Sequence, residues 1–139
     1  MTLLDRITDS EQETVACAQD FARALTGGEF LALKGDLGAG KTVFVRGLAS
    51  VLAPEAAVSS PSYAVVHEYG GPLSLCHFDL YRISGEDDLY SVGFFDYEGC
   101  VMAVEWSEHL GELIPPERYE ITITKTDENC RRIQIEKLS

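Results

Sequence analysis

The sequence predicts an α/β fold in which a mixed parallel and antiparallel sheet is layered between helices. Three observations indicate this fold. The first third of the chain has the order helix, short apolar strand, helix, which is typical of parallel sheets. Two later strands are joined by Gly70-Gly71-Pro72, and such a turn predicts antiparallel pairing. The chain ends in a strictly alternating hairpin, so the sheet is expected to be mixed.

The expected elements follow from capping signals and hydrophobic spacing. A first helix is expected after Asp9 or Ser10, where Glu13 can complete a capping box. It is expected to end at Gly27-Gly28, and its apolar residues recur at helical spacing: Val15, Ala18, Phe21, Ala22 and Leu25. Residues 30–33 predict a buried strand. Residues 41–52 predict a second helix, which Pro54 ends.

The second half of the chain is dominated by strands. Residues 63–69 and 73–79 predict the antiparallel pair, and residues 100–106 predict a buried strand. A short acidic helix is expected around 85–92, within a stretch (86–98) that has no Lys or Arg. Residues 119–124 and 132–136 predict the closing hairpin, with four residues on one face: Ile121, Ile123, Ile133 and Ile135.

Length and charge limit the possible functions. With 139 residues, of which 45% are hydrophobic, the chain fits one domain spanning 1–139. A net charge of −12 disfavours nucleic-acid binding over the whole surface, and it also disfavours binding to anionic membrane surfaces. The longest apolar runs fall far short of the roughly 20 residues of a membrane span. The four cysteines form no CxxC pair. Cys76 and Cys100 lie in apolar runs and are expected to be small core residues. We therefore expect a cytoplasmic protein with reduced thiols and no zinc.

The strongest functional signal is the segment GDLGAGKT, which matches G-x-x-x-x-G-K-S/T between an expected strand and an expected helix. Glycines let backbone N–H groups surround a phosphate, and the helix N-terminus adds positive potential there. Lys41 is then expected at the β- and γ-phosphates and the Thr42 hydroxyl at Mg²⁺. With the mixed sheet, the motif predicts a P-loop NTPase-like three-layer sandwich. The residues expected to contact the nucleotide are Gly35, Asp36, Leu37, Gly38, Ala39, Gly40, Lys41, Thr42 and Val43.

A phosphate loop needs acidic partners, and two carboxylates stand at the ends of apolar runs. Glu105 ends CVMAVE and Asp79 ends LSLCHFD. One of them is expected to hold Mg²⁺, directly or through water, and the other to orient the attacking water. Spacing alone does not assign the two roles.

Four segments in this order resemble the TsaE family of small bacterial P-loop ATPases: GDLGAGKT, SPSY at 60–63, HFDLYR at 77–82 and VEW at 104–106. The resemblance runs from about Gly35 to Trp106. Ser62 departs from it, since the family usually has Thr there, although the hydroxyl is kept.

The resemblance implies an ATP- and Mg²⁺-dependent protein with weak ATPase activity of its own. It implies a role with the TsaD and TsaB proteins in threonylcarbamoyl modification of adenosine 37 in tRNAs that read ANN codons, with the tRNA held mainly by those partners. It places Thr42 and Glu105 at the magnesium and makes Asp79 necessary for hydrolysis.

Two further residues are candidate nucleotide contacts. Arg82 is an expected phosphate contact and, among the eleven basic residues, the one expected to act as an arginine finger within the chain. A surface salt bridge is its alternative. Trp106, the single tryptophan, is expected either to stack near the nucleotide or to be a core or interface aromatic.

Two rival functions remain open at this point. A small-molecule or nucleotide kinase would share the phosphate loop, although 139 residues leave little room for a lid and an acceptor site. A nucleotide-dependent interaction module would bind ATP without needing turnover. Release of phosphate, with and without acceptors, separates the kinase from the other two.

Overall fold

The computed structural model describes residues 1–35, 39–54, 66–70, 73–81, 83, 85–91 and 99–138, with backbone only at 66, 67, 86 and 91. Seven strands form one sheet with the order β1-β7-β6-β2-β5-β4-β3. The elements in chain order are β1 (Thr2–Thr8), α1 (Glu11–Ala22), β2 (Phe30–Lys34), α2 (Lys41–Leu52), β3 (Val66–Tyr69), β4 (Leu75–Asp79), α3 (Glu86–Ser91), β5 (Val101–Glu105), η2 (Ser107–Leu113), β6 (Arg118–Lys125) and β7 (Arg131–Leu138).

The sheet is mixed, as the sequence predicted. Strand β2 is parallel to both β5 and β6, and β4 is parallel to β5. Antiparallel pairs lie at the two sides, where β7 pairs with β1 and β6, and β3 pairs with β4. The carboxyl ends of β2, β4, β5 and β6 therefore meet at one edge of the sheet, which is where parallel sheets place their binding sites.

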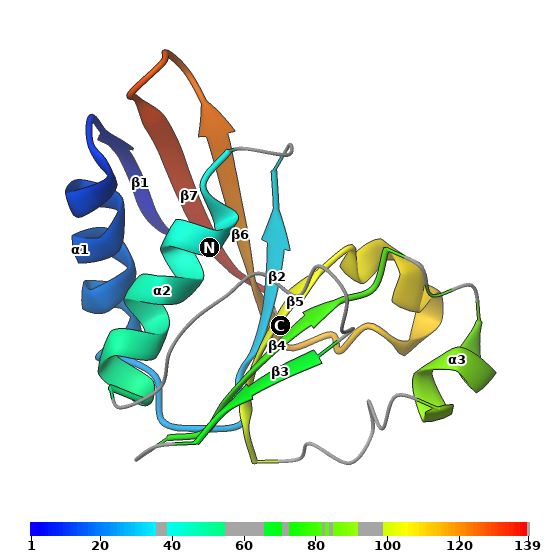
Figure 1. Ribbon diagram of the computed structural model, residues 1–139. Helices are drawn as coiled ribbons and strands as arrows, with labels where there is room; N and C mark the ends of the chain where they lie inside the picture. Colours follow the sequence, from blue (N-terminus) through cyan, green and yellow to red (C-terminus); the bar gives the residue numbers. More distant parts are fainter. Residues whose placement is uncertain are drawn as a thin grey trace.

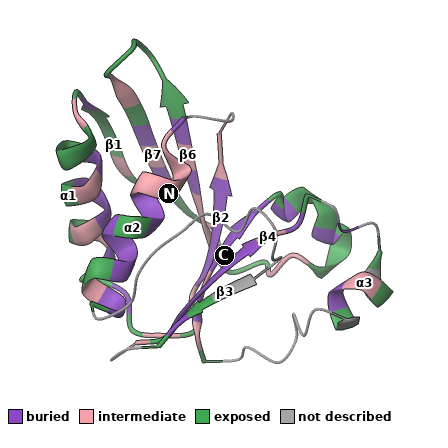
Figure 2. Cartoon of the chain, viewed as in Figure 1, coloured by how far each residue is buried: buried purple, intermediate pink, exposed green. Residues whose placement is uncertain are grey.

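Helices cover both faces of the sheet and make the third layer that the sequence predicted (Figure 1). Helices α1 and α2 cover one face, over a core that includes Phe44, Leu48 and the four isoleucines of the closing hairpin. On the other face a smaller core joins Phe78 to Leu89 of α3 and Leu110 of η2. Figure 2 shows the central strands as the most deeply buried part of the molecule.

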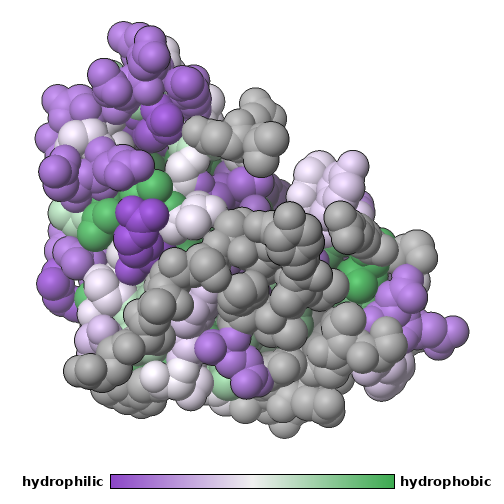
Figure 3. Space-filling model, viewed as in Figure 1, coloured by the Kyte–Doolittle hydropathy of each residue, from purple (hydrophilic) through white to green (hydrophobic). Residues whose placement is uncertain are grey.

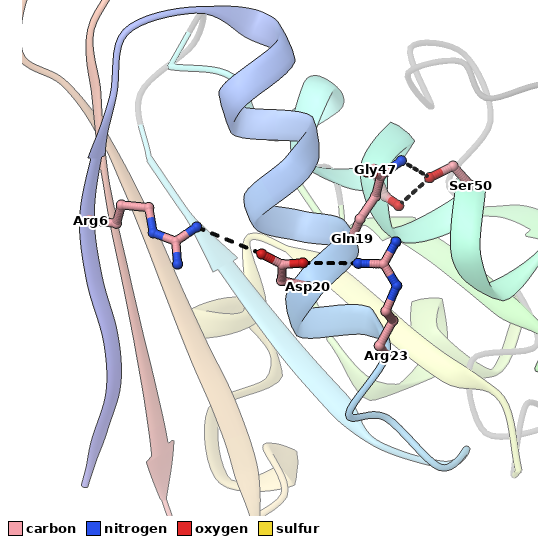
Figure 4. A network of polar contacts seen from close by, with 6 residues as sticks. All are labelled: Arg6, Gln19, Asp20, Arg23, Gly47 and Ser50. Carbon is pink, nitrogen blue, oxygen red and sulfur yellow. Dashed lines mark hydrogen bonds and ion pairs between the residues drawn. The ribbon is translucent and has the colours of Figure 1, made fainter.

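Helices α1 and α2 pack closely because Gly47 lies at their contact. A Cβ at Gly47 would stand 2.6 Å from the Cβ of Ala18 and 2.7 Å from the carbonyl oxygen of Val15. At the rim of this contact Gln19 donates to Ser50 Oγ over 2.9 Å, as Figure 4 shows. The tight contact fixes α2, and with it the residues at its start, against the rest of the fold.

The same close-up shows how strand β1 is joined to α1. Asp20 lies between Arg6 of β1, at 3.9 Å, and Arg23, at 2.9 Å (Figure 4). All three side chains are exposed, so these ion pairs add little stability. The position of β1 therefore does not depend on these ion pairs.

The structure differs from the sequence-based expectations in four places, one of which is η2, a 3₁₀ helix that was not predicted. Strand β1 was not predicted. Helix α1 starts after Ser10 as expected, with Ser10 Oγ accepting from the backbone N–H of Glu13, but it ends at Ala22, before Leu25. Cys100 is only partly buried, so of the two cysteines assigned to the core only Cys76 lies there. The expected loop at 59–62 and the start of the 63–69 strand lie outside the described residues.

The surface in Figure 3 is hydrophilic over the β6–β7 turn at the top of the view. Among the residues described, no helix has both the length and the apolar character needed to cross a membrane.

Candidate functional site

The glycine-rich loop, Gly35 to Thr42, connects the end of β2 to the start of α2. Gly35 has φ of +151°, and a Cβ there would lie 2.5 Å from the carbonyl oxygen of Ile123 in β6. Gly40 caps α2 with φ of +110° and contributes no side-chain hydrogen bond. The first N–H groups of α2 are therefore available to an anion. Asp36, Leu37 and Gly38 lie outside the described residues.

Lys41 is folded back over this loop. Its Nζ donates to the carbonyl oxygen of Gly35 over 2.8 Å and stands 3.3 Å from Oε1 of Glu105. Its side chain is 13% exposed. The ammonium group is thus held by the carbonyl oxygen of Gly35 and the carboxylate of Glu105.

Glu105, the last residue of β5, is nearly buried and has a second partner. Its Oε2 lies 2.6 Å from Nε2 of His77, which is completely buried in β4. Burial by itself raises the pKa of the Glu105 carboxyl. The hydrogen bond and charge of His77 and the charge of Lys41 outweigh that effect, and the pKa lies below its usual value. Glu105 is therefore ionised at neutral pH.

Asp79 ends the neighbouring strand, and its backbone pairs in register with that of Glu105. Its Oδ1 accepts a hydrogen bond from the backbone N–H of Tyr81 over 3.0 Å. Adjacent parallel strands are about 4.8 Å apart. The fold therefore brings together the two carboxylates that the sequence marked as strand-end acids, on the face of the sheet covered by α2.

Trp106 directly follows Glu105 in the left-handed conformation, with φ of +60° and ψ of +39°. This conformation is uncommon for a bulky residue. The indole is 40% exposed, lies 4.9 Å from the ring of Tyr81 and 5.6 Å from that of His109, and is not a core residue. Nδ1 of His109 bonds the carbonyl oxygen of Leu80 over 2.6 Å. The two strand ends are thus linked just beyond the carboxylates.

A cavity of about 610 Å³ opens between these groups. The sequence-predicted residues that line it are Gly35, Gly40, Lys41, Thr42, Val43, Asp79, Glu105 and Trp106. Ala39 lies beside it, through a carbonyl that accepts from Nε of Arg131 over 2.8 Å. Arg82 lies outside the described residues.

Six lining residues were not singled out from the sequence. They come from the start of α1 and from the β6–β7 turn: Ser10, Glu11, Thr14, Glu128, Asn129 and Arg131. Arg131 also donates to the carbonyl oxygens of Asp127, Glu128 and Cys130. The structure thus places the guanidinium group of Arg131 at the candidate site. No local motif marks it, because Arg131 and Ala39 are 92 positions apart in the chain.

His77 was also missed, although a signal for it exists. His77 and Asp79 are two residues apart on one strand, so their side chains lie on the same face of the sheet. A histidine on the same face as a strand-end acid is a candidate partner of that acid or of its neighbour.

Comparisons with known proteins show the family of the chain. A family model described as threonylcarbamoyl adenosine biosynthesis protein TsaE matches residues 8–133. The chain belongs to the TsaE family. The TsaE of Bacillus subtilis is 39% identical over 128 residues, which is 91% of this chain and 80% of the relative. The TsaE of Aquifex aeolicus is 38% identical over 136 residues, which is 96% of each.

A solved structure is similar over the whole chain. A crystal structure of Bacillus subtilis YdiB superposes with a TM-score of 0.77 at 35% identity, over 100% of this chain and 88% of that one. The resemblance to the TsaE family that the motifs indicated is therefore confirmed, as is the α/β fold with a mixed sheet. This TsaE family member is a protein of tRNA threonylcarbamoyladenosine biosynthesis.

Proposed function

We propose that this TsaE family member binds ATP with Mg²⁺ in the cavity at the glycine-rich loop and hydrolyses it slowly. We further propose that this cycle supports threonylcarbamoyl modification of adenosine 37 in tRNAs that read ANN codons, in the cytoplasm and together with TsaD and TsaB. One observation carries the proposal: Lys41, Thr42, Asp79 and Glu105 line a single cavity at the carboxyl edge of the parallel strands.

Lys41 is the group that would meet the β- and γ-phosphates. It lies across the loop with its charge partly shielded from water, where a charge-assisted bond to phosphate is strong. When a phosphate binds, we expect its ammonium group to move from Oε1 of Glu105 to the phosphate oxygens. The free protein therefore holds the lysine in place with a carboxylate that ATP would have to displace.

The donors present suit magnesium. Thr42 offers a hydroxyl and Glu105 an ionised carboxylate, and Mg²⁺ prefers hard oxygen ligands. Among the described residues no group of three or more His, Cys, Asp or Glu side chains forms a complete metal site. Mg²⁺ is commonly bound through one or two protein oxygens and the phosphates of a nucleotide. When bound, the ion would offset the charge that develops on the phosphates.

Asp79 is the second carboxylate at the cavity, and it would orient the attacking water. It is half-buried at the cavity wall, next to Glu105 in the strand register, and has no lysine or arginine partner among the described residues. A carboxylate without such a partner can accept a proton or orient a water molecule.

Slow turnover follows from the few cations at the cavity. Of its described lining residues, only Lys41 and Arg131 are basic, and Arg131 is engaged with backbone carbonyls. Phosphoryl transfer needs positive charge in the transition state, which a partner protein often supplies. The net charge of −12 agrees with a tRNA held by other subunits.

Phosphate release by the purified protein tests the proposal. We expect slow Mg²⁺-dependent release from ATP without any acceptor, well below the typical enzyme median of about 10 s⁻¹, and a change in rate when TsaD and TsaB are added. Lys41→Ala should abolish ATP binding. Lys34→Ala is the matched control, because Lys34 pairs with Glu120 at 3.0 Å and does not line the cavity.

Three results would contradict the proposal. ADP formation that requires an added small-molecule acceptor, without release of inorganic phosphate, would indicate a kinase. ATP binding without any release, alone or with the partners, would indicate an interaction module. Equal ATP binding by the Lys41 and Lys34 variants would place the nucleotide elsewhere.

A further inference from the structure

His77 is a buried polar side chain with a single hydrogen bond. It has no exposed surface, and its Nε2 lies 2.6 Å from Oε2 of Glu105. Its Nδ1 has no hydrogen-bond partner in the described part of the protein. Because the ionised Glu105 carboxylate can only accept, Nε2 of His77 carries the proton and donates it.

The strand itself does not need this imidazole. Its neighbours in β4 are apolar and buried, and a leucine there would leave no unpaired nitrogen. Burying a polar atom without a partner destabilises the folded state. The role of the imidazole is therefore to be sought in its one hydrogen bond, which it makes to the Glu105 carboxylate.

The carboxylate is held at both of its oxygens. Oε2 accepts from His77, while Oε1 lies 3.3 Å from Nζ of Lys41 and so faces the glycine-rich loop. Nucleotide binding would remove Lys41 from Oε1 but would leave the bond to His77 in place. The buried histidine is thus the contact that keeps the carboxylate oriented when its other partner departs.

We propose that His77 is a positioning residue for Glu105, which directs Oε1 toward the glycine-rich loop so that the carboxylate is already oriented for Mg²⁺ when the nucleotide binds. This inference rests on the proposed function, since it requires Glu105 to serve the metal. It concerns a residue that does not line the cavity.

The test compares glutamine and asparagine at position 77, because their side-chain amides extend to different distances from the backbone. In His77→Gln the amide nitrogen extends to about the position of Nε2 and can donate to Glu105, whereas in His77→Asn it is one methylene shorter and cannot. His77→Leu removes the donor altogether. Cys76→Ala is the matched control, because Cys76 is the buried neighbour of His77 in β4 and belongs to the core on the other face of the sheet.

Calorimetry with ATP, in EDTA and in Mg²⁺, gives the gain in affinity due to the metal. Electron paramagnetic resonance of Mn²⁺ with ADP measures metal binding without any turnover. We expect His77→Leu and His77→Asn to lose about 10- to 100-fold in metal affinity, as supporting residues of metal ligands commonly do. Their affinity for metal-free ATP should be close to wild type. His77→Gln should recover most of the loss, and Cys76→Ala should lose nothing.

Two results would overturn the inference. The first is an unchanged Mn²⁺ affinity in His77→Asn, which also decides the matter if His77→Leu does not fold. The second is an equal loss of affinity for metal-free and metal-bound nucleotide, which would show a general disturbance of the pocket. A wild-type protein that binds ATP equally with and without Mg²⁺ would instead contradict the proposed function, and this inference with it.

Discussion

Replacing Glu105 by glutamine tests whether the free protein holds Lys41 away from the nucleotide. Oε1 of Glu105 stands 3.3 Å from Nζ of Lys41, and both side chains are nearly buried. Glutamine keeps the size of the side chain and an oxygen that can accept from His77, but it removes the charge. We expect Glu105→Gln to bind metal-free ATP more tightly than wild type and to lose the gain that Mg²⁺ gives.

The magnitude follows from the geometry. Two unit charges 3.3 Å apart attract by about 5 kcal/mol at an effective dielectric constant of about 20. Most of this is cancelled by the cost of removing both charges from water. A net contribution of about 1–2 kcal/mol remains, which corresponds to a gain of about 5- to 30-fold in affinity for metal-free ATP.

Calorimetric titration with ATP in EDTA and then in Mg²⁺ measures both effects. Glu120→Gln is the control, because Glu120 also pairs with a lysine, Lys34 at 3.0 Å, but lies outside the cavity. A Glu105→Gln protein that binds metal-free ATP more weakly than wild type would refute the reasoning. So would one that keeps the full gain from Mg²⁺.

Four other changes have defined outcomes. Thr42→Ala should weaken Mg-ATP more than metal-free ATP, and equal losses in calorimetry would remove Thr42 from the metal. Asp79→Asn should keep ATP affinity and slow phosphate release by about 10²-fold or more, as the loss of a general base does; release at the wild-type rate would exclude that role. Gly47→Ala should lower the free energy of unfolding by about 1–3 kcal/mol in a urea titration, because the new Cβ meets Ala18; wild-type stability would show that α1 and α2 can separate at no cost. Because the folded state lowers the pKa of Glu105, its contribution to stability is fully present above the unfolded value of about 4.3 and is lost as the pH falls through the folded pKa. The difference in unfolding free energy between wild type and Glu105→Gln should therefore shrink on acidification, and a constant difference down to pH 2 would contradict the assigned pKa shift.

The parts of the fold that the sequence predicted are those with a strong local signal. Ile121, Ile123, Ile133 and Ile135 alternate, and all four lie in the core. The cap at Ser10 was likewise local and correct. Strand β1 was missed because it is an edge strand with six of its seven residues at least partly exposed. Its apolar residues do not alternate, so no period-2 pattern marks it.

The candidate site likewise contains residues that the sequence predicted and residues that it did not. The glycine-rich loop and the strand-end acids Asp79 and Glu105 follow from motif and strand position, and the fold places them at one cavity. Arg131 and the start of α1 reach that cavity only through long-range strand pairing and helix packing. His77 depends on which neighbouring strand carries Glu105, which is a property of strand order and not of local spacing.

A crystal structure with Mg²⁺ and a non-hydrolysable ATP analogue tests the central claim most directly. The account predicts the phosphates at Lys41 and Thr42, with Nζ of Lys41 moved from Glu105 to the phosphates and the bond between His77 and Glu105 retained. A nucleotide bound elsewhere, such as the cavity of about 690 Å³ beside Arg118 and Lys137, would contradict it. So would phosphates in the expected cavity with Lys41 still paired to Glu105.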